Sequence, residues 1–396
     1  MPEPLPVVEV GPVAHGGHCV ARLDGQVVFV RHALPGEQVR LRITDRSASF
    51  LRADAVEVLH ASPDRVEPPC SWAATCGGCD FQHVSPAAQR GLLTDVVREQ
   101  LRRIAAITWD GVVEEVTPHL GWRTRMQYTT DASGRLGLRA HRSHEVVAVD
   151  RCRIAHADLP QVDERVRAER IETAVSSSGE QAVVIDGELR RGPRHLTEHV
   201  HHRTFGVEAD GFWQVHPSAA TTLVDAVLAA ADLRPGERVA DLYAGVGLFS
   251  AFAAEAVGRM GHVVSVEWDR KASALARENL ADLPQARVRQ GATERIAPRL
   301  RGMDVVILDP PRAGAKKAVS VIAGLGPRRI VYVSCDPASL ARDLARFGER
   351  GYEFRDLRAF ALFPMTHHVE CVAVLDRAAG VRTTAATGTT NNGSDL

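Results

Sequence analysis

Arg238-Val-Ala-Asp-Leu-Tyr-Ala-Gly-Val-Gly247 is the stretch that decides the fold of the C-terminal half of this 396-residue chain. Its apolar residues predict a buried strand, and its glycines predict a tight turn in which the backbone can approach a ligand closely. A second apolar run, 262–266, leads to Glu267, whose carboxylate can accept hydrogen bonds from ribose hydroxyls. Strand-like runs at 304–308 and 329–334 follow, with helical segments between them. The pattern predicts a doubly wound, mostly parallel α/β sheet.

The glycine turn separates two cofactors that such a sheet can bind, NAD and S-adenosylmethionine. A dinucleotide fingerprint has glycine or alanine at its third position, and here that position is Ser250. The pattern Asp-x-x-x-Gly-x-Gly over 241–247 is the methyltransferase form. Asp309-Pro-Pro-Arg312 follows a strand where base-modifying methyltransferases place their target. Enzymes that methylate amino groups have an aromatic residue after the two prolines, so Arg312 argues against an exocyclic amine as the target.

A cysteine stands at the end of a later strand, in Val331-Tyr-Val-Ser-Cys-Asp-Pro337. Because α/β enzymes place their chemistry at the carboxyl edge of the sheet, Cys335 is a candidate nucleophile. Asp336 and Pro337 predict the start of a helix, and we expect its positive end to favour the Cys335 thiolate. The alternative is a buried structural cysteine.

The N-terminal segment differs in character from the rest of the chain. Short segments between 7 and 59 alternate apolar and polar residues and are separated by turn residues, which predicts a small antiparallel β-barrel over 1–62. Barrels of this kind often bind oligonucleotides. The arginines expected to face outward are Arg22, Arg31, Arg40, Arg42 and Arg46. They indicate either an RNA-binding face or an ordinary solvated face, because acidic residues lie nearby.

A cysteine cluster follows a proline-rich joint at 62–69. Its members are Cys70, Cys76 and Cys79, with Cys152 far downstream. Four thiolates in this spacing suit a closed zinc site or a 4Fe-4S cluster, and the three-plus-one arrangement favours iron–sulfur. The alternative is a thioredoxin-like redox pair at Cys76 and Cys79, which would leave the other two cysteines without a role.

The remaining segments complete the expected domain organisation. Residues 63–205 are expected to form a central α+β domain that contains the cysteine cluster and a helix at 86–104. The doubly wound sheet would occupy 206–376, and the polar tail 377–396 is expected to be disordered. Four histidines at 195–202 suggest either a metal or, as we favour, a solvated loop or strand edge.

Composition limits the kinds of binding surface, the cellular location and the cysteine chemistry that we expect. The net charge is −1, so an RNA-binding surface requires local clusters of arginine. The chain shows no leader pattern and no apolar run long enough to span a membrane, which predicts a cytoplasmic protein. The 7 unevenly spaced cysteines favour metal binding or catalysis over disulfides. We expect a monomer with no obligate protein partner.

Taken together, these motifs resemble the S-adenosylmethionine-dependent RNA uridine-C5-methyltransferases, in particular the iron–sulfur branch with an N-terminal TRAM domain. The resemblance covers nearly the whole chain. The matching motifs are the barrel, the four clustered cysteines, Phe212-Trp-Gln-Val, the turn at 241–247, Asp309-Pro-Pro-Arg-Ala-Gly314, Ser334-Cys-Asp-Pro337 and His368-Val-Glu-Cys371. The resemblance implies a C-terminal Rossmann-like class I methyltransferase domain. It also implies an enzyme that makes 5-methyluridine in RNA, with ribosomal RNA favoured over transfer RNA by the iron–sulfur branch.

The resemblance also implies roles for individual residues. Cys335 would be the nucleophile that adds to C6 of the uracil, and Glu370 the base that removes the C5 proton. Contacts to S-adenosylmethionine or to the uridine would come from Gln214, Tyr243, Glu267 and Asp309. The iron–sulfur ligands would be Cys70, Cys76, Cys79 and Cys152. Without the resemblance, Glu370 would be interpreted as a surface carboxylate on a final strand.

Two positions depart from the family pattern, and two other functions remain open. His216 and Leu248 stand where relatives often have asparagine, so a polar contact to the cofactor or the base is altered or missing. The first alternative function is an iron–sulfur or NAD-linked oxidoreductase, which methyl transfer to RNA would exclude. The second is a catalytically degenerate RNA-binding protein, and the presence of both a nucleophile and a base argues against it.

Overall fold

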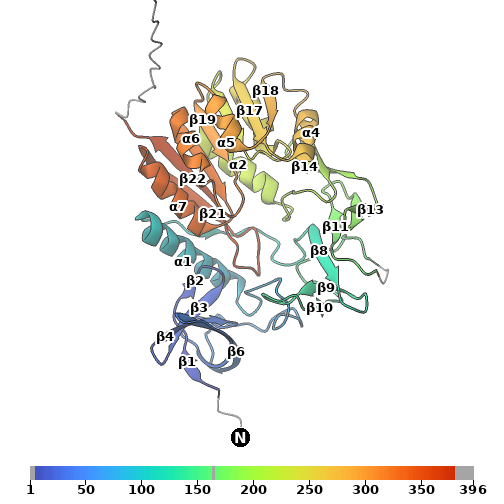
Figure 1. Ribbon diagram of the computed structural model, residues 1–396, viewed down its shortest axis with the longest axis vertical. Coiled ribbons are helices and arrows are strands. Elements are labelled where there is room, and N and C mark those ends of the chain that lie inside the picture. Colours follow the sequence, from blue (N-terminus) through green and yellow to red (C-terminus); the bar gives the residue numbers. More distant parts are fainter. Residues whose placement is uncertain (1–4, 163–165, 380–396) are drawn as a thin grey trace, which may run out of the picture.

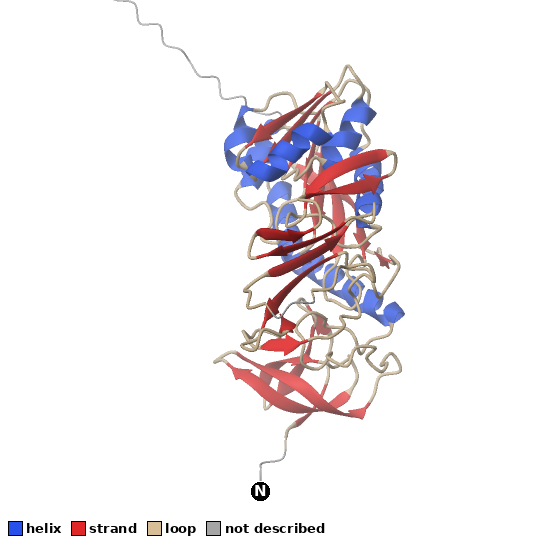
Figure 2. Ribbon diagram, turned by 90° about the vertical axis from the view of Figure 1, so that its right-hand side faces the viewer, coloured by secondary structure: helices blue, strands red, loops and turns tan. Residues whose placement is uncertain are grey.

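The computed structural model describes residues 5–162 and 166–379. Three large sheets follow one another along the long axis of the molecule: N-terminal, central and C-terminal, the last flanked by helices (Figures 1 and 2). The mixed α/β architecture expected from the sequence is confirmed. Within the described ranges, no helix combines the length and the apolar character needed to cross a membrane. Of the tail predicted to be disordered, 380–396 lies outside the described residues, and Arg377 still belongs to a strand.

The N-terminal sheet has a core with the expected period of two. Its strands are β1 (Val7–Glu9), β2 (Val13–Ala14), β3 (His18–Leu23), β4 (Gln26–Arg31), β5 (Gln38–Arg46) and β6 (Phe50–His60), in the order β1-β5-β6-β4-β3-β2. Val28 and Val30 of β4 and Val39 and Leu41 of β5 are fully buried. The expectation of an antiparallel barrel is wrong for one pair, since β4 and β6 run parallel. The chain turns back once between β4 and β5 and again between β5 and β6. Strands β4 and β6 therefore run in the same direction.

Helix α1 (Pro86–Ala105) lies between the N-terminal sheet and the C-terminal sheet (Figure 1). The Ser85 side chain accepts a hydrogen bond from the Ala88 backbone N–H, and Pro86 occupies the first turn, as helix starts favour. The buried face of α1 consists mainly of Leu92, Leu93, Val96, Val97 and Leu101. The predicted helix at 86–104 therefore forms, one residue longer at its end.

The central sheet has six strands, in the order β10-β9-β8-β11-β12-β13. They are β8 (Arg125–Thr130), β9 (Leu136–Arg139), β10 (Val146–Ala148), β11 (Ile171–Val175), β12 (Gln181–Ile185) and β13 (Glu188–Arg191). A separate hairpin follows, β14 (His195–Val200) and β15 (Arg203–Glu208). The apolar side chains of this hairpin, including Leu196 and Phe205, share a core with α2 (Ala219–Ala231) and α3 (Leu248–Val257) of the C-terminal part. The predicted domain boundary at 205 falls within β15 and remains a proposal.

The C-terminal sheet has eight strands, in the order β18-β17-β16-β19-β20-β22-β21-β7. The strands are β16 (Arg238–Leu242), β17 (His262–Glu267), β18 (Ala286–Gln290), β19 (Val305–Leu308), β20 (Arg329–Ser334), β21 (Tyr352–Phe360), β22 (Glu370–Arg377) and the short β7 (Val113–Glu114). The helical segments are α2 (Ala219–Ala231), α3 (Leu248–Val257), α4 (Arg270–Asn279), α5 (Thr293–Ile296), η1 (Ala297–Arg299), α6 (Ala318–Leu325) and α7 (Pro337–Gly348). Strands β16 to β20 are parallel, while β22 lies antiparallel between β20 and β21.

Candidate functional site

The carboxyl edge of the parallel strands brings together most of the predicted site residues. Tyr243 follows β16, Glu267 ends β17, Asp309 follows β19 and Cys335 follows β20. Glu370 joins them from the start of β22, because an antiparallel strand begins where its parallel neighbours end. The topology therefore places the proposed nucleophile and base at the same edge as the glycine turn.

The glycine turn is held by Glu267. The Glu267 carboxylate accepts hydrogen bonds from the backbone N–H groups of Gly245 (2.9 Å) and Asp269 (2.7 Å). Gly247 has φ +90°, and a Cβ there would lie 3.2 Å from the Leu280 side chain, so the turn needs glycine at this position. Each Glu267 oxygen keeps a second lone pair for a ribose hydroxyl. The geometry is compatible with the predicted role of Glu267.

A buried pair lies beneath this turn. Asp241 is fully buried and accepts a hydrogen bond from the Ser250 hydroxyl, with 2.5 Å between the oxygens. Burial raises the pKa of Asp241 to about 7, and the Ser250 hydrogen bond opposes that shift. Ser250 therefore stabilises the Asp241 carboxylate. In the sequence, Ser250 was noted only because it stands where a dinucleotide fingerprint has glycine or alanine. The spacing of the two residues gave no signal of this contact.

The expectation that Cys335 favours the thiolate is wrong for the free protein. Burial raises the pKa of Cys335 to about 12, and the neighbouring Glu370 and Asp309 raise it further. Asp336 does cap α7, its side chain accepting a hydrogen bond from the Ser339 N–H at 2.7 Å. However, the capping carboxylate raises the pKa of Cys335 as well, so it opposes the helix dipole. Arg312 is the group that lowers it.

Glu370 is buried and is not a surface carboxylate. Its side chain sits in β22 with 4% exposure. Burial raises its pKa well above the usual range, and Asp309 raises it further, while Arg312 lowers it. The pKa of Asp309 is raised too: burial and the nearby Asp241 raise it to about 7. Buried acids whose pKa values are shifted by one another are typical of catalytic sites.

The loop before Glu370 holds Arg312 in place. Arg312 Nη2 lies 3.1 Å from His368 Nε2. The preceding His367 pairs with Asp80, with 2.6 Å between Nδ1 and Oδ2, and its backbone N–H donates to the same oxygen at 3.1 Å. This segment therefore connects the C-terminal sheet to the residue that follows Cys79. The sequence gave no reason to expect the Asp80 contact.

Gln214 and His216 lie on the loop before α2, and Leu248, the second departure from the family pattern, lies at the start of α3. Gln214 is buried on the loop that precedes α2. His216 is also buried: its Nδ1 accepts the Ser218 N–H, and its Nε2 lies 3.3 Å from the Pro118 carbonyl oxygen. Both ring nitrogens of His216 are thus used within the protein. Leu248 begins α3 with its side chain buried, as a packing residue.

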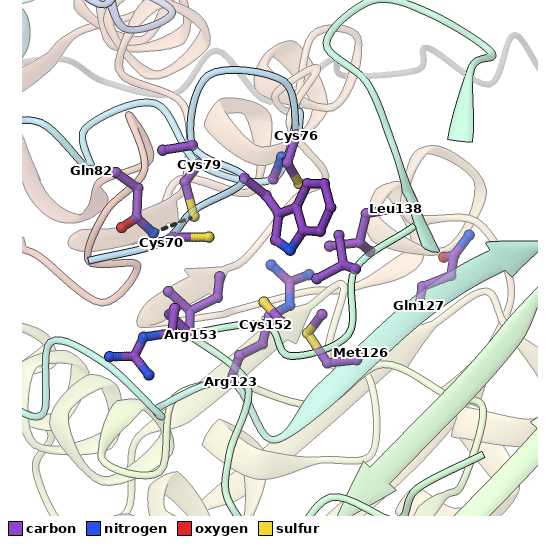
Figure 3. Close-up of a pocket in the computed structure, with 15 residues that line it drawn as sticks. Cys70, Cys76, Cys79, Gln82, Arg123, Met126, Gln127, Leu138, Cys152 and Arg153 are labelled. Atoms are coloured by element: carbon purple, nitrogen blue, oxygen red, sulfur yellow. Dashed lines mark hydrogen bonds between the residues drawn. The ribbon is translucent and has the colours of Figure 1, made fainter. Parts of the chain in front are cut away.

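The four clustered cysteines surround one cavity, apart from the carboxyl-edge site. Cys70, Cys76, Cys79 and Cys152 all line a space of about 140 Å³ (Figure 3). N–H groups point at three of the sulfurs. The Gln82 side chain donates to Cys79 (3.3 Å) and the Gly78 backbone to Cys76 (3.4 Å). Burial raises the pKa of Cys152, and the backbone N–H groups of Ile154 and Ala155 oppose that shift. Arg123, which is half-buried, lines the same cavity.

This cavity suits a negatively charged group that is held by sulfur. N–H donors to sulfur and a nearby cation stabilise thiolates that ligate a cluster. Nevertheless, across 5–162 and 166–379 no group of three or more His, Cys, Asp or Glu side chains is close enough to hold a metal ion. All seven cysteines are free, so no disulfide forms between Cys76 and Cys79. The histidines at 195–202 also form no metal site, and three of them lie beside carboxylates: His195, His201 and His202.

Comparison with known proteins agrees with this arrangement. Residues 7–56 match the model of the TRAM domain, 292–378 that of tRNA (Uracil-5-)-methyltransferase, and 199–293 that of Protein-L-isoaspartate(D-aspartate) O-methyltransferase. A Streptomyces avermitilis protein described as an RNA methyltransferase is 46% identical, over 94% of this chain and 98% of its own. A Bifidobacterium longum protein with the same description is 37% identical, over 93% and 96%.

The chain belongs to the RNA (uracil-C5)-methyltransferase family. A solved structure adds support at the level of the fold. The Pyrococcus abyssi tRNA (uracil-54, C5)-methyltransferase, in complex with S-adenosyl-L-homocysteine, superimposes with a TM-score of 0.69 at 22% identity, over 92% of this chain and all of that one. As an S-adenosylmethionine-dependent RNA (uracil-C5)-methyltransferase, the protein is not an NAD-linked oxidoreductase. The resemblance inferred from the sequence motifs is confirmed for the methyltransferase family and the TRAM domain, as is the enzyme class.

Proposed function

We propose that this methyltransferase makes 5-methyluridine in ribosomal RNA through a covalent bond between Cys335 and C6 of the target uracil. The observation that carries the proposal is the placement of Cys335 and Glu370 at one sheet edge, where the carboxylate raises the pKa of the thiol. The Glu370 carboxylate affects the ionisation of the Cys335 thiol, so the two groups are neighbours, and we propose that both act on one base.

The residues at this edge support a sequence of balanced steps. The Cys335 thiol first loses its proton to water. The thiolate sulfur then adds to C6, forming the S–C6 bond and moving an electron pair onto C5 as an enolate. When bound, S-adenosylmethionine supplies an electrophilic methyl group and a positive sulfonium charge. C5 takes the methyl group, and the electron pair of the broken methyl–sulfur bond stays on the sulfur, which leaves as S-adenosylhomocysteine. Glu370 then accepts the C5 proton. The electron pair left on C5 re-forms the C5–C6 double bond and expels the Cys335 sulfur.

Several charged groups prepare Cys335 for this chemistry. In the free protein the thiol retains its proton, since burial raises the pKa of Cys335 to about 12. Arg312 lowers the pKa of both Cys335 and Glu370, and His368 orients its guanidinium. We propose that Gln214, Tyr243, Glu267 and Asp309 contact the cofactor or the uridine.

RNA that contains 5-fluorouridine tests the covalent step. Fluorine cannot leave C5 as a proton, so the reaction would stop with the protein attached to the RNA. We expect an adduct that survives denaturation and that requires both S-adenosylmethionine and Cys335. The absence of an adduct with an RNA that the enzyme methylates well would contradict the mechanism.

The proposal favours ribosomal RNA because the four-cysteine pocket fits the iron–sulfur branch of the family. Transfer RNA is the second candidate, because the matching family model and the Pyrococcus abyssi structure are both described as tRNA enzymes. Mapping of 5-methyluridine in both RNAs, from cells with and without the gene, distinguishes the two. We further propose that the enzyme acts as a monomer.

We propose that Cys70, Cys76, Cys79 and Cys152 hold a 4Fe-4S cluster. Protein purified without oxygen is expected to contain iron and acid-labile sulfide, and Cys76→Ser should lose most of both, because one ligand is removed. Elemental analysis with a sulfide assay measures this directly. Cys19→Ser is the matched control, since Cys19 is buried in β3 away from the cavity. Zinc in place of iron, or an unchanged iron content in Cys76→Ser, would contradict the proposal.

We propose that the RNA-binding face of the N-terminal sheet includes Arg52, which was not among the arginines expected from the sequence. Of the predicted arginines, Arg40 and Arg42 are paired with Glu57 and Asp54. Arg52 of β6 instead lies over two aromatic rings, 5.5 Å from the centre of Phe29 and 5.1 Å from that of Phe50. Such a platform of arginine and aromatic side chains can stack bases and contact phosphate.

Arg52→Ala is expected to weaken RNA binding without changing the affinity for S-adenosylmethionine. Loss of one phosphate contact should reduce the slope of log K against log salt by about one. Filter binding over a salt series measures the slope. Arg40→Ala serves as the control, because Arg40 is neutralised by Glu57 at 2.8 Å. Equal slopes for Arg52→Ala and the wild type would show that Arg52 does not contact RNA phosphate.

A further inference from the structure

The turn between β2 and β3 reaches from the N-terminal sheet to the catalytic loops. It consists of His15, Gly16 and Gly17. His15 Nε2 lies 3.0 Å from Asp336 Oδ2, across 321 positions of the chain. Asp336 directly follows the proposed nucleophile. A side chain of the barrel therefore contacts the residue next to Cys335.

The two carboxylate oxygens of Asp336 have different hydrogen-bond partners. One oxygen accepts the Ser339 N–H that begins α7, at 2.7 Å, and the other faces His15. The Asp336 N–H also donates to the Ser334 hydroxyl, at 3.3 Å. The hydrogen bonds from His15 and Ser339 outweigh burial and lower the pKa of Asp336 to about 2, so it is a carboxylate. Restraint of Asp336 in this way restrains the Cys335 backbone, one peptide unit away.

The other end of the turn packs against the loop that leads to Glu370. Gly17 has φ +78°, and a Cβ there would lie 2.8 Å from the Cβ of His367 and 3.2 Å from that of Asp80. Only glycine permits both this backbone conformation and this approach. His367 precedes Glu370 by three positions and is itself bonded to Asp80. The turn therefore contacts both segments that present the proposed catalytic pair.

We propose that His15 is a positioning residue, which acts through Asp336 to hold the Cys335 sulfur in line for attack on C6. The inference rests on the proposed function, since it takes Cys335 as the nucleophile. It adds a role for the barrel beyond binding RNA: the barrel completes the catalytic geometry. Displacement of a reacting group by about 1 Å can cost on the order of a hundredfold in rate. The His15 contact is thus placed to influence kcat more than RNA affinity.

The test compares His15→Ala with His15→Gln and with His60→Ala. We expect His15→Ala to lower kcat and the rate of adduct formation with 5-fluorouridine RNA by at least about tenfold. RNA affinity and melting temperature should stay close to those of the wild type. His15→Gln should recover part of the loss, because its amide can donate to Asp336. His60→Ala, on the same sheet and bonded to Gln38, should leave all four quantities unchanged.

Gly17→Ala provides a second variant with its own control. It adds strain and a clash with His367, whereas Gly16→Ala adds similar strain at φ +96° but meets only the His18 ring, at 3.4 Å. We expect a larger loss of kcat in Gly17→Ala. A wild-type kcat in His15→Ala, or a loss confined to RNA affinity or stability, would overturn the inference. Normal turnover in Cys335→Ala would instead overturn the proposed function, so the two failures are distinguishable.

Discussion

Replacement of Cys335 by alanine is expected to abolish methylation of RNA. Without the sulfur nothing adds to C6, and C5 of uracil is too weak a nucleophile to take the methyl group unaided. Turnover should fall by a factor on the order of 10⁶, the loss that follows removal of an enzyme's nucleophile. Transfer of a labelled methyl group from S-adenosylmethionine measures the rate. Calorimetry should show that the cofactor still binds.

Cys371→Ala is the matched control for this variant. Cys371 is fully buried in β22 and lies opposite Ser334, one residue before the proposed nucleophile. We expect Cys371→Ala to keep both methyl transfer and the adduct with 5-fluorouridine RNA. If Cys335→Ala still formed the adduct and Cys371→Ala did not, the nucleophile would be Cys371 and the assignment of Cys335 would be wrong.

The pH dependence of the adduct reports the ionisation of Cys335. Its pKa is raised to about 12, so the thiolate fraction increases with pH throughout the range in which the protein can be assayed. The rate of adduct formation should therefore rise from neutral to alkaline pH. A flat profile under saturating RNA would contradict this assignment.

Glu370→Gln is expected to stop the reaction after methyl transfer. The amide has the shape of the carboxylate but cannot accept the C5 proton, so the methylated uridine should stay attached to Cys335. Turnover should fall by about 10²–10⁴-fold, the usual contribution of a positioned base. Mass spectrometry of denatured enzyme and ordinary RNA should detect a covalent complex that contains the transferred methyl group.

Glu353→Gln controls for the loss of a carboxylate on the same sheet. Glu353 lies on β21, exposed and paired with Arg355. It should show normal turnover and no trapped complex. Wild-type turnover in Glu370→Gln would assign the base to another group. Loss of turnover with no trapped complex would place Glu370 before methyl transfer.

Much of the fold could be predicted because its signals are local. The strand and turn at 238–247 and the helix at 86–105 depend on residues close together in the chain. The insertion of β22 between β20 and β21, the addition of β7 to the edge and the packing of the β14–β15 hairpin could not be predicted. These pairings join distant segments, and no local pattern specifies which segments will meet.

The sequence by itself determined the family, the cofactor class and the residues proposed for catalysis, because motif order and residue chemistry are written along the chain. Only the tertiary structure decided the state of those residues. Cys335 is a thiol in the free protein because the fold buries it beside Glu370. His15 reaches Asp336 because the barrel turn lies against the carboxyl edge. Burial and long-range contacts determine charge and position, and both arise only when the chain is folded.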